Sequence, residues 1–401
     1  MEMTTRRAFL AQAAAGALAA QATGGRKKIA AISTAYHVRS HSDNFITRFL
    51  EGYWINDRYY PPPCDVVSLY TAQVHPNDIS RRLAAAYGFK IYPTIADALT
   101  LGTGKLAVDG VLLIGEHGNY PVNERLQKLY PRYEFFREVV EVYEKSGRAA
   151  PVFNDKHLYY DWKKARWMYD QSRRLKFPMM AGSSCSVTFR RPELDFPLET
   201  VFEEALAIGG GWIEDGGIFH NLEVLQCFVE RRKGGETGVR AVEHLEGAAV
   251  WKAGAEGRWA RRLVEPALSR AERPLGIKPE EARNPVVCIV EYNDGFRAAT
   301  LQLPGVSKYH FAARVGGQVH STLCYTPTEN SNNFSPLVDS IARMFLHGTL
   351  DYPVERTLLT TGALSFLMES RYRDHQRIET PDLKIAYRAP KSSYYAGGRG
   401  S

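Results

Sequence analysis

The stretch Val108-Asp-Gly-Val-Leu-Leu-Ile-Gly-Glu-His-Gly-Asn-Tyr120 decides the fold. A short apolar run bounded by turn residues ends in the polar pair Glu116 and His117, which is typical of a buried parallel strand that opens into a crevice. The stretch Pro151-Val-Phe-Asn-Asp-Lys-His-Leu158 has the same pattern, and apolar residues recur at helical spacing from Tyr130 to Tyr143. Strand, helix and strand therefore predict a right-handed crossover unit.

Strands and helices alternate in this way from Lys28 to Gly182, which predicts a doubly wound parallel sheet. In the usual strand order, 3-2-1-4-5, the ends of the first, fourth and fifth strands are neighbours. Open α/β sheets bind ligands at this carboxyl edge. We therefore expect one crevice lined by the polar residues that follow these strands: His37, His41, Glu116, His117, Asp155, Lys156 and His157.

Composition places the chain among ordinary globular proteins. Its 401 residues give room for two domains, and 44% hydrophobic with 24% charged residues exclude general disorder. The net charge of +7 arises from basic residues scattered among acids, without a basic run interleaved with aromatic residues. We therefore expect no nucleic-acid partner. The five cysteines have neither metal nor redox spacing, so no disulfide is indicated.

The first 22 residues are set apart from the fold. Arg6 and Arg7 precede an Ala-rich, weakly apolar run, and Ala20-Gln-Ala22 has the small-x-small form of a signal peptidase site. The segment resembles a twin-arginine export signal and is too short to span a bilayer stably. We expect it to be cleaved, leaving a periplasmic protein without a membrane anchor. An Ala-rich amphipathic helix is the alternative.

The pattern changes after residue 182. Residues 200–208 read as a helix that breaks at Gly209-Gly-Gly211. Longer alternating runs follow from Val286 to Tyr325, and the Asp294-Gly295 turn between two of them is a strong hairpin signal. We therefore expect a Rossmann-like domain over 27–182, an α/β domain with a large, mainly antiparallel open sheet over 183–388, and a flexible tail over 389–401.

The loop after the first strand lacks the expected phosphate-binding glycines. A dinucleotide-binding domain has Gly-x-Gly-x-x-Gly there, so that the backbone can approach the pyrophosphate. The segment from Thr34 to Asp43 contains no glycine but has His37, Arg39 and His41 near the start of a helix, where an anion can still be attracted. The second strand ends at Thr71, where an acid that reads the ribose is expected.

The order of these elements resembles that of the Gfo/Idh/MocA family of sugar and cyclitol oxidoreductases. The run from Val108 to Ile114 is similar to the family's fourth strand, and Asn154-Asp-Lys-His-Leu158 stands where the family has Glu-Lys-Pro. Gly209-Gly-Gly-Trp-Ile-Glu-Asp-Gly-Gly-Ile-Phe-His220 is similar to its Gly-rich run, although Asp215 and His220 are five residues apart where the family usually has four. Glu355-Arg-Thr-Leu-Leu-Thr-Thr-Gly362 and Glu369-Ser-Arg371 are similar to its penultimate helix.

The resemblance implies an oxidoreductase that uses NAD or NADP and acts on a small carbohydrate or cyclitol. It implies that Lys156 holds the substrate oxygen and the nicotinamide ribose, that His220 is the acid/base, and that Asp215 orients it. It also implies a homo-oligomer, because the family's open sheet commonly packs against another subunit. The expected cofactor-binding residues are Ser33, Thr34, His37, Thr71, Glu116, His117, Asn119 and Asp155.

Two alternatives stay open in the sequence. One is a lyase, epimerase or hydrolase that uses a divalent metal instead of a dinucleotide, although the spacing matches no known metal signature. Its ligands would come from His37, His41, Glu116, His117, Asp155 and His157. The other is a non-catalytic carbohydrate-binding protein that stacks sugar rings on Tyr120, Tyr159, Tyr160, Trp162 and Trp212.

Overall fold

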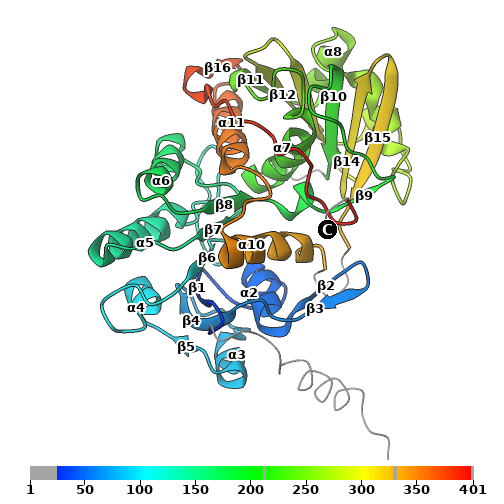
Figure 1. Cartoon of the computed structure of the whole chain (residues 1–401). Helices are drawn as coiled ribbons and strands as arrows, with labels where there is room; N and C mark the ends of the chain where they lie inside the picture. The colour runs from blue at the N-terminus through cyan, green and yellow to red at the C-terminus, as the bar shows by residue number, and fades with distance from the viewer. Residues whose placement is uncertain (1–24, 211–213, 328–331, 399–401) are drawn as a thin grey trace, which may run out of the picture.

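The computed structural model describes residues 25–210, 214–327 and 332–398. In this part of the chain a parallel sheet lies below a larger, mainly antiparallel sheet, with helices on the faces of both (Figure 1). The expected export segment, residues 1–22, lies outside the described residues, and so does Trp212. No helix among the described residues is long and apolar enough to cross a membrane.

The lower sheet has six parallel strands in the order β5-β4-β1-β6-β7-β8, which confirms the predicted order and extends it by one strand. Ser33 pairs with Ile114 and Asp155 pairs with Gly182, so the carboxyl ends of four neighbouring strands lie at one edge. The strands are β1 (Lys28–Ser33), β4 (Asp65–Thr71), β5 (Lys90–Ile91), β6 (Gly110–Ile114), β7 (Val152–Asp155) and β8 (Met179–Gly182).

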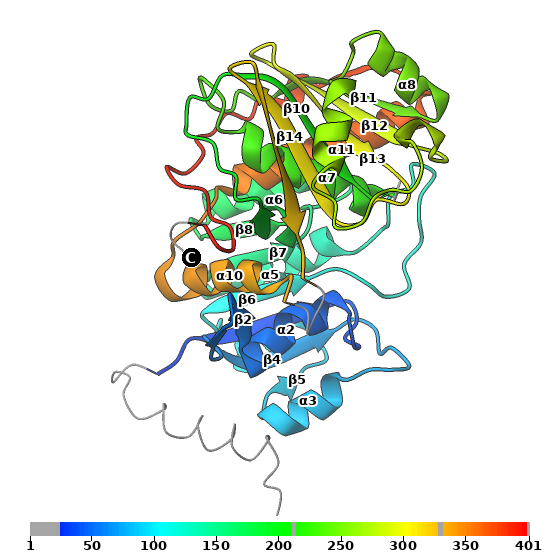
Figure 2. The ribbon, with the colours of Figure 1, turned by 90° about the vertical axis from the view of Figure 1, so that its right-hand side faces the viewer.

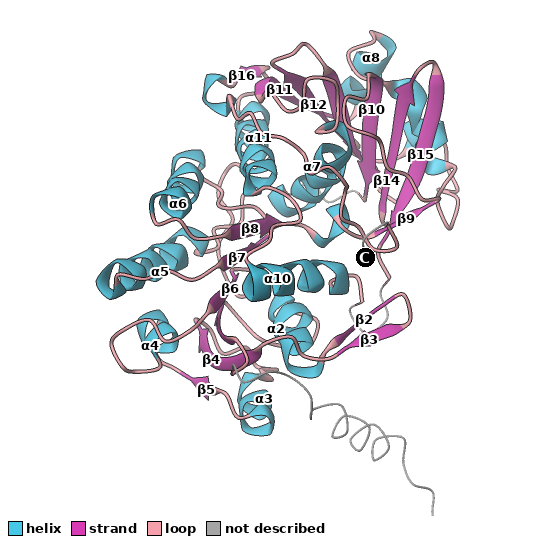
Figure 3. Ribbon diagram, viewed as in Figure 1, coloured by secondary structure: helices cyan, strands magenta, loops and turns pink. Residues whose placement is uncertain are grey.

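Helices cover both faces of the lower sheet (Figure 3). Ala30 and Ile32 of β1 belong to one core and Ile29 and Ala31 to another, because successive side chains of a strand point to opposite faces. The first core contains side chains of α4 (Ile95–Thr100), α5 (Arg132–Ser146) and α6 (Trp162–Arg174). The second contains side chains of α2 (His41–Glu51), α3 (Ser80–Tyr87) and α10 (Ser335–His347).

Helix α10 belongs to the second half of the sequence but packs on the lower sheet. A Cβ on Gly110 would lie 2.8 Å from the ring of Phe345, so glycine at the start of β6 permits this close approach. The chain therefore passes between the lower and upper parts of the molecule more than once, and α10 connects the second half of the sequence to the lower sheet.

The upper sheet has eight strands in the order β16-β11-β12-β13-β10-β14-β15-β9 and is open at both edges. Only β10 and β13 are parallel neighbours, which confirms a mainly antiparallel sheet. Its strands are β9 (Phe189–Arg191), β10 (Phe202–Gly209), β11 (Val239–Glu246), β12 (Val286–Tyr292), β13 (Arg297–Gln302), β14 (Tyr309–Val315), β15 (Gln318–Tyr325) and β16 (Ile378–Glu379).

The helix predicted over residues 200–208 is wrong, because this segment forms β10 at the centre of the upper sheet. Ala205, Leu206, Ala207 and Ile208 are all buried, two on each face. A strand that is buried on both faces shows no alternation, and a short continuous apolar run then cannot be told from a helix by periodicity.

Both faces of the upper sheet are covered by helices (Figure 2). The core that contains Ala205 and Ala207 includes side chains of α7 (Asp215–Val229) and α11 (Val354–Tyr372). The core that contains Leu206 and Ile208 includes side chains of α8 (Ala248–Ala255) and α9 (Val264–Leu268). Helix α7 thus lies between the upper sheet and the rest of the molecule, which brings its first turn to the edge of the lower sheet.

A hairpin of β2 (Tyr53–Ile55) and β3 (Arg58–Tyr60) follows α2 and was not expected from the sequence. Its two-residue turn has positive φ values of 50° and 60°, as a type I′ turn requires. In the tail, for which the sequence predicts flexibility, Pro390 and Lys391 accept hydrogen bonds from Arg231, and the Ala396 N–H donates to the carbonyl of Val187.

Candidate functional site

Five ionisable side chains meet where the carboxyl edge of the lower sheet approaches α7; we call Glu116, Arg132, Lys156, His157 and Asp215 the buried charge cluster. Glu116 follows β6 and forms ion pairs with Arg132 and with Lys156, whose Nζ lies 3.0 Å from Oε2. Arg132, at the start of α5, also donates to His157 Nε2 at 3.2 Å. The Asp215 carboxylate lies 3.8 Å from the same His157 nitrogen. The cluster is therefore one connected group.

Burial and charge set the protonation states in the buried charge cluster. Burial raises the pKa of Glu116, but the positive charges of Lys156 and Arg132 outweigh it and hold that pKa well below its usual range. Burial lowers the pKa of His157 well below its usual range, and Arg132 lowers it further. Burial also raises the pKa of Asp215 to about 6, against the opposing effect of Arg132. The cluster thus has one firmly ionised carboxylate and one that titrates near neutral pH.

The backbone of Lys156 is held in an uncommon conformation. Its φ of 61° lies in the left-handed region, which costs a residue with a Cβ about 1–2 kcal/mol. Its N–H donates to the carbonyl of Gly182 at 3.1 Å, so the neighbouring strand β8 holds this conformation. The Lys156 side chain extends toward α7. Its Nζ lies 3.7 Å from the point that a Cβ would occupy if Gly216 had a side chain. Lys156 therefore reaches the first turn of the helix that carries His220.

His220 is held by Ser183, which follows β8. The two are joined by a hydrogen bond of 2.6 Å between Ser183 Oγ and His220 Nδ1, and Cys185 Sγ lies 3.9 Å from the same nitrogen. Burial and then the charge of Lys156 lower the pKa of His220 well below its usual range, so the ring is neutral. Nε2 has no hydrogen-bond partner among the described residues, which leaves it available to a ligand.

Asp215 does not contact His220, although the resemblance implied that it orients this histidine. Its Oδ2 accepts the N–H of Lys128 at 3.3 Å and its Oδ1 accepts the N–H of Gly216 at 2.8 Å. Both Asp215 and Gly216 lie in the first turn of α7, so the two side chains five positions apart leave the helix in different directions. Asp215 belongs to the buried charge cluster, and the orienting contact comes from Ser183.

Four histidines gather at the same edge; we call His37, His41, His75 and His117 the imidazole cluster. The ring of His37 lies 4.1 Å from that of His75 and 5.6 Å from that of His117, and His41 lies 5.2 Å from His117. His41 Nδ1 also lies 2.6 Å from the carboxylate of Asp155, the residue before Lys156. Burial, and then His41, lowers the pKa of His117 to about 4. The imidazole cluster therefore adjoins the residues around Lys156.

The other expected cofactor residues lie along this edge with partners of their own. Ser33 Oγ contacts Ser42 Oγ at 2.5 Å, and Thr34 Oγ1 donates to the carbonyl of Glu116 at 2.5 Å. Thr71 donates to the carbonyl of Gln73 at 2.9 Å. The Gln73 amide spans the gap to Asn119, accepting its N–H at 2.8 Å and donating to its carbonyl at 3.1 Å. Thr71 and Asn119 therefore lie on the β4 and β6 side, linked through Gln73.

The loop after β1 offers no glycine-lined turn, so a dinucleotide would have to be bound there through side-chain donors. Tyr36 fills the loop after β1: it is fully buried, and its hydroxyl lies 2.9 Å from Thr47 Oγ1. At the start of α2, Ser40 accepts the N–H of Asp43, and Asp43 accepts the N–H of Arg39. The remaining donors at this edge are the partly buried imidazoles, which can donate N–H groups to phosphate oxygens.

The residues considered as metal ligands are divided among other partners. His41 pairs with Asp155, and Glu116 pairs with two cationic side chains. Within residues 25–210, 214–327 and 332–398, no group of three or more His, Cys, Asp or Glu side chains is placed to hold a metal ion. The placement of these side chains lends no support to the metal-dependent alternative.

The aromatic residues considered for sugar stacking are mainly core. Tyr159 and Trp162 are 1% and 9% exposed, and Tyr160 stacks on Tyr159 at 4.1 Å. Tyr120 contacts Tyr130 edge to face at 5.5 Å. These contacts are those of packed side chains.

Sequence reasoning missed three residues of the site. Arg132 is fully buried at the centre of the charge cluster, yet a single arginine at the start of a helix gives no signal for this. Ser183 and His75 could have been predicted, because each follows a strand of the parallel sheet, as Glu116 and Lys156 do. Polar residues after every strand, including the edge strands, would have had to be considered.

No protein-family model matches this sequence, and no curated protein sequence matches it. Solved structures do match. GenD2 from gentamicin A biosynthesis, solved in complex with NAD, has a TM-score of 0.54 and 12% identity, covering 90% of this chain and 98% of that chain. A putative myo-inositol dehydrogenase from Sinorhizobium meliloti has a TM-score of 0.54 and 12% identity, with 88% and 99% covered. The myo-inositol 2-dehydrogenase from Lactobacillus plantarum has a TM-score of 0.54 and 9% identity, with 88% and 99% covered.

These likenesses span nearly the whole length of the matched structures at low sequence identity, and they establish the fold. The order of the lower sheet and the mixed upper sheet agree with it. The chain has the two-domain fold of the inositol dehydrogenases, which confirms the fold that the resemblance to the Gfo/Idh/MocA family predicted.

Proposed function

We propose that the protein is an oxidoreductase that transfers hydride between a nicotinamide dinucleotide and a hydroxyl-bearing carbon of a small sugar or cyclitol. The observation that carries the proposal is the approach of Lys156 to the first turn of α7, the helix that carries the neutral His220. A cation that can hold a hydroxyl oxygen and a base that can remove its proton thus lie at the carboxyl edge of a Rossmann-type sheet, where such folds bind ligands.

His220 acts as the base in this proposal. Its ring is neutral because of burial and the nearby positive charge of Lys156, so it is ready to accept a proton at neutral pH. With Nδ1 donating to Ser183 Oγ, the lone pair of Nε2 takes the proton from the substrate hydroxyl. In the reverse direction the protonated ring returns that proton to the carbonyl oxygen.

Lys156 holds the oxygen that changes charge. As the hydroxyl loses its proton, negative charge develops on the oxygen, and the ammonium group of Lys156 stabilises it by a charge-assisted hydrogen bond. Glu116 keeps this ammonium in place through the 3.0 Å ion pair, and Arg132 fixes Glu116 from the other side. The buried charge cluster therefore positions Lys156.

NAD(P) would lie along the carboxyl edge, where its nicotinamide supplies the hydride acceptor. His37, His75 and His117 would donate to its phosphates, and Asp155 with Lys156 would lie toward the nicotinamide ribose. The choice of small carbohydrate or cyclitol follows the structural neighbours, which include inositol dehydrogenases and GenD2, an NAD-bound protein from gentamicin A biosynthesis.

The test is turnover of a panel of inositols, aldoses and amino sugars with NAD+ and NADP+, followed by the absorbance of the reduced nicotinamide. His220→Gln should lower kcat by about 10²–10⁴-fold, the usual contribution of a general base, with dinucleotide binding unchanged. His347→Gln, on the exposed end of α10, is the matched control and should leave kcat unchanged. Equal activity of His220→Gln and the parent would reject the assignment.

A second function is favoured by one observation, the buried Tyr36 in the loop where a phosphate cradle is expected. A lyase or epimerase that needs only proton transfer would use Lys156 and His220 in the same roles without a dinucleotide. Exchange of solvent deuterium into the substrate carbon, without any NAD(P)H formed or consumed, would favour this function over hydride transfer.

We further propose export by the twin-arginine route to the periplasm and assembly into a homo-oligomer. Export rests on Arg6, Arg7 and the cleavage-like sequence that ends at Ala22. Replacing both arginines by lysine should retain the protein in the cytoplasmic fraction, and unchanged periplasmic recovery would refute export. Light scattering of the mature protein should give a multiple of the chain mass, and a monomer would refute assembly.

A further inference from the structure

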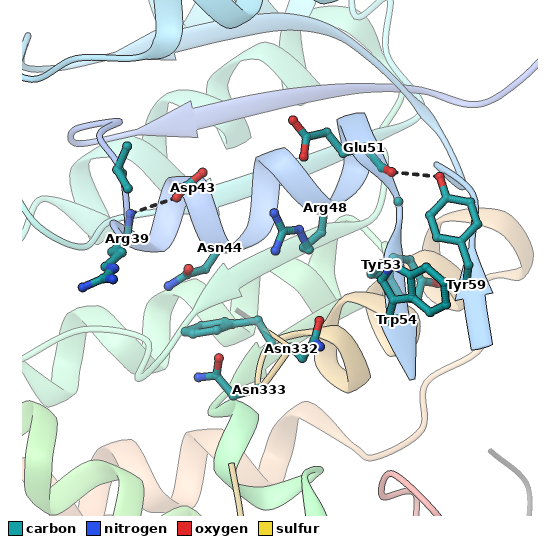
Figure 4. Close-up of a pocket in the computed structure, with 13 residues that line it drawn as sticks. Arg39, Asp43, Asn44, Arg48, Glu51, Tyr53, Trp54, Tyr59, Asn332 and Asn333 are labelled. Atoms are coloured by element: carbon teal, nitrogen blue, oxygen red, sulfur yellow. Dashed lines mark hydrogen bonds between the residues drawn. The ribbon is translucent and has the colours of Figure 1, made fainter. Parts of the chain in front are cut away.

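A cavity lies beside α2, and neither Lys156 nor His220 lines it. Its volume is about 830 Å³, within the range of small-molecule sites. Figure 4 shows Arg39 and Asp43 at one end and Trp54 and Tyr59 at the other, with Asn44 and Arg48 between them on α2. Phe334 lines it, and the Phe334 ring lies 5.1 Å from that of His41 at the carboxyl edge. The cavity therefore lies near the carboxyl edge, and Phe334 lies between its lining and His41.

Two exposed aromatic rings form one end of this cavity. Trp54 is 48% exposed and Tyr59 46% exposed, and their ring centroids are 5.3 Å apart. Two contacts hold the hairpin that carries them: Tyr59 donates to the carbonyl of Glu51 at 2.9 Å, and Tyr53 stacks on Tyr60 at 5.4 Å. Such rings on a fixed support offer apolar faces to a ligand without a large loss of conformational freedom on binding.

Gly52 makes this arrangement possible. It ends α2 with a φ of 80°, and a Cβ there would lie 2.4 Å from the carbonyl oxygen of Tyr60 and 2.6 Å from the Tyr59 hydroxyl. A residue with a side chain would push the hairpin away from α2. The position of Trp54 and Tyr59 at the end of the cavity therefore depends on the glycine at position 52.

Asn44 presents its amide to the cavity. The residue is 8% exposed, and its side chain makes no hydrogen bond to any described residue. Its amide oxygen and nitrogen are therefore open to the cavity, where ligand hydroxyls can bind to both. Asn332 and Asn333 add two more amides on the opposite wall (Figure 4).

The charges that line the cavity cancel. Two arginines, Arg39 and Arg48, are matched by two acids, Asp43 and Glu51. Asp43 already accepts from the N–H of Arg39 and from the Thr47 hydroxyl, and Glu51 accepts from the Tyr87 hydroxyl. A phosphate or carboxylate ligand would find no excess positive charge there. The lining favours a neutral ligand that has both an apolar face and many hydroxyl groups.

We propose that this cavity binds a neutral saccharide ring, stacked on Trp54 and Tyr59 and hydrogen-bonded by the Asn44 amide. A sugar ring combines an apolar face of C–H groups with hydroxyls at its rim, which is what two aromatic faces beside unpartnered amides can recognise. The site is independent of the proposed redox function, since it shares no residue with Lys156, His220 or the buried charge cluster.

The experiment measures binding and needs no turnover. Neutral di- and trisaccharides of glucose, galactose and N-acetylglucosamine, with galacturonic acid oligomers as charged counterparts, are titrated by calorimetry and by tryptophan fluorescence. At least one neutral saccharide should bind saturably. Trp54→Ala should weaken it by about tenfold or more, the effect of losing one aromatic contact, and Asn44→Ala should also weaken it. Trp54→Phe should retain most of the affinity.

Two further variants keep the result interpretable. Tyr372→Ala removes an aromatic side chain of similar exposure, 46%, from α11 and should leave saccharide affinity unchanged. Lys156→Ala alters the proposed active site and shows whether the measured binding belongs to that site instead. The proposal is overturned if no neutral saccharide binds, if only charged ones do, or if Lys156→Ala abolishes binding while Trp54→Ala does not. It is also overturned if Trp54→Ala dissociates an oligomer in the absence of sugar, because the hairpin is then a subunit contact.

Discussion

Replacing Glu116 by glutamine tests the buried charge cluster. Glutamine keeps the size and one acceptor oxygen of Glu116 but removes the negative charge that faces both Arg132 and Lys156. The side chain of Glu116 is 6% exposed, and those of its two partners are 0% and 11% exposed. The substitution therefore removes the carboxylate that pairs directly with two nearly buried cations, in a region where water screens charge poorly.

The magnitude follows from this burial. Removing one partner of a buried ion pair costs about 3–5 kcal/mol, because the remaining charge stays desolvated. We expect this loss in the free energy of unfolding, which corresponds to a fall in Tm of roughly 4–6 °C, at about 1.2 °C per kcal/mol for a chain of 401 residues. Since the pKa of Glu116 is lowered in the folded protein, its stabilisation is fully present above its unfolded pKa of about 4.3 and is lost as the pH falls through the folded pKa.

Urea unfolding and calorimetry at neutral pH, repeated in acid, measure this effect. Glu144→Gln is the matched control, because Glu144 forms an ion pair with Arg174 in which both side chains are about half exposed. An exposed pair contributes about 0–1 kcal/mol, so the control should barely change Tm. The difference between Glu116→Gln and the parent should shrink as the pH falls. A loss within about 1 kcal/mol, no larger than that of the control, would refute the reasoning.

Three further variants test other parts of the structure. Burial raises the pKa of Asp215 to about 6, so the folded state loses stability as the pH rises from about 4 to about 6. The free energy of unfolding of Asp215→Asn, measured in urea, should therefore rise relative to that of the parent by about 3 kcal/mol between pH ~4 and ~8. A gain independent of pH would contradict this. Ser183→Ala should lower kcat about tenfold with KM little changed, because one hydrogen bond to His220 is lost, whereas unchanged kcat would show that Ser183 does not position the ring. Gly110→Ala should cost about 1–3 kcal/mol by overpacking against Phe345, and Phe345→Leu in the same chain should recover part of it; a neutral Gly110→Ala would disprove the close contact.

The lower sheet follows from the sequence because its strands are short apolar runs bounded by turn residues and separated by amphipathic helices. The upper sheet was predictable where one turn signal, Asp294-Gly295, stood between alternating runs. Strand β10 was not, since burial on both faces removes the alternation that identifies a strand. The hairpin of β2 and β3 was also missed, because its Asn56-Asp57 turn lacks the glycine that usually marks a type I′ turn.

The site was predictable only in part. Glu116 and Lys156 follow neighbouring strands of a parallel sheet, and the common edge of such strands brings them together regardless of loop details. The placement of Arg132 depends on how the loop before α5 folds, and no local pattern encodes that. The contact between Ser183 and His220 joins the two halves of the molecule, so it depends on how α7 lies against the lower sheet.

The most direct test of the central claim is the binding of NAD(H) and NADP(H) to the folded protein, by calorimetry and by mass spectrometry of any ligand released on denaturation. We expect one dinucleotide to bind per chain, with affinity weakened by His37→Ala and unchanged by His347→Gln. If neither the oxidised nor the reduced form of NAD or NADP binds, and none is released from the protein as purified, the proposed hydride transfer is contradicted.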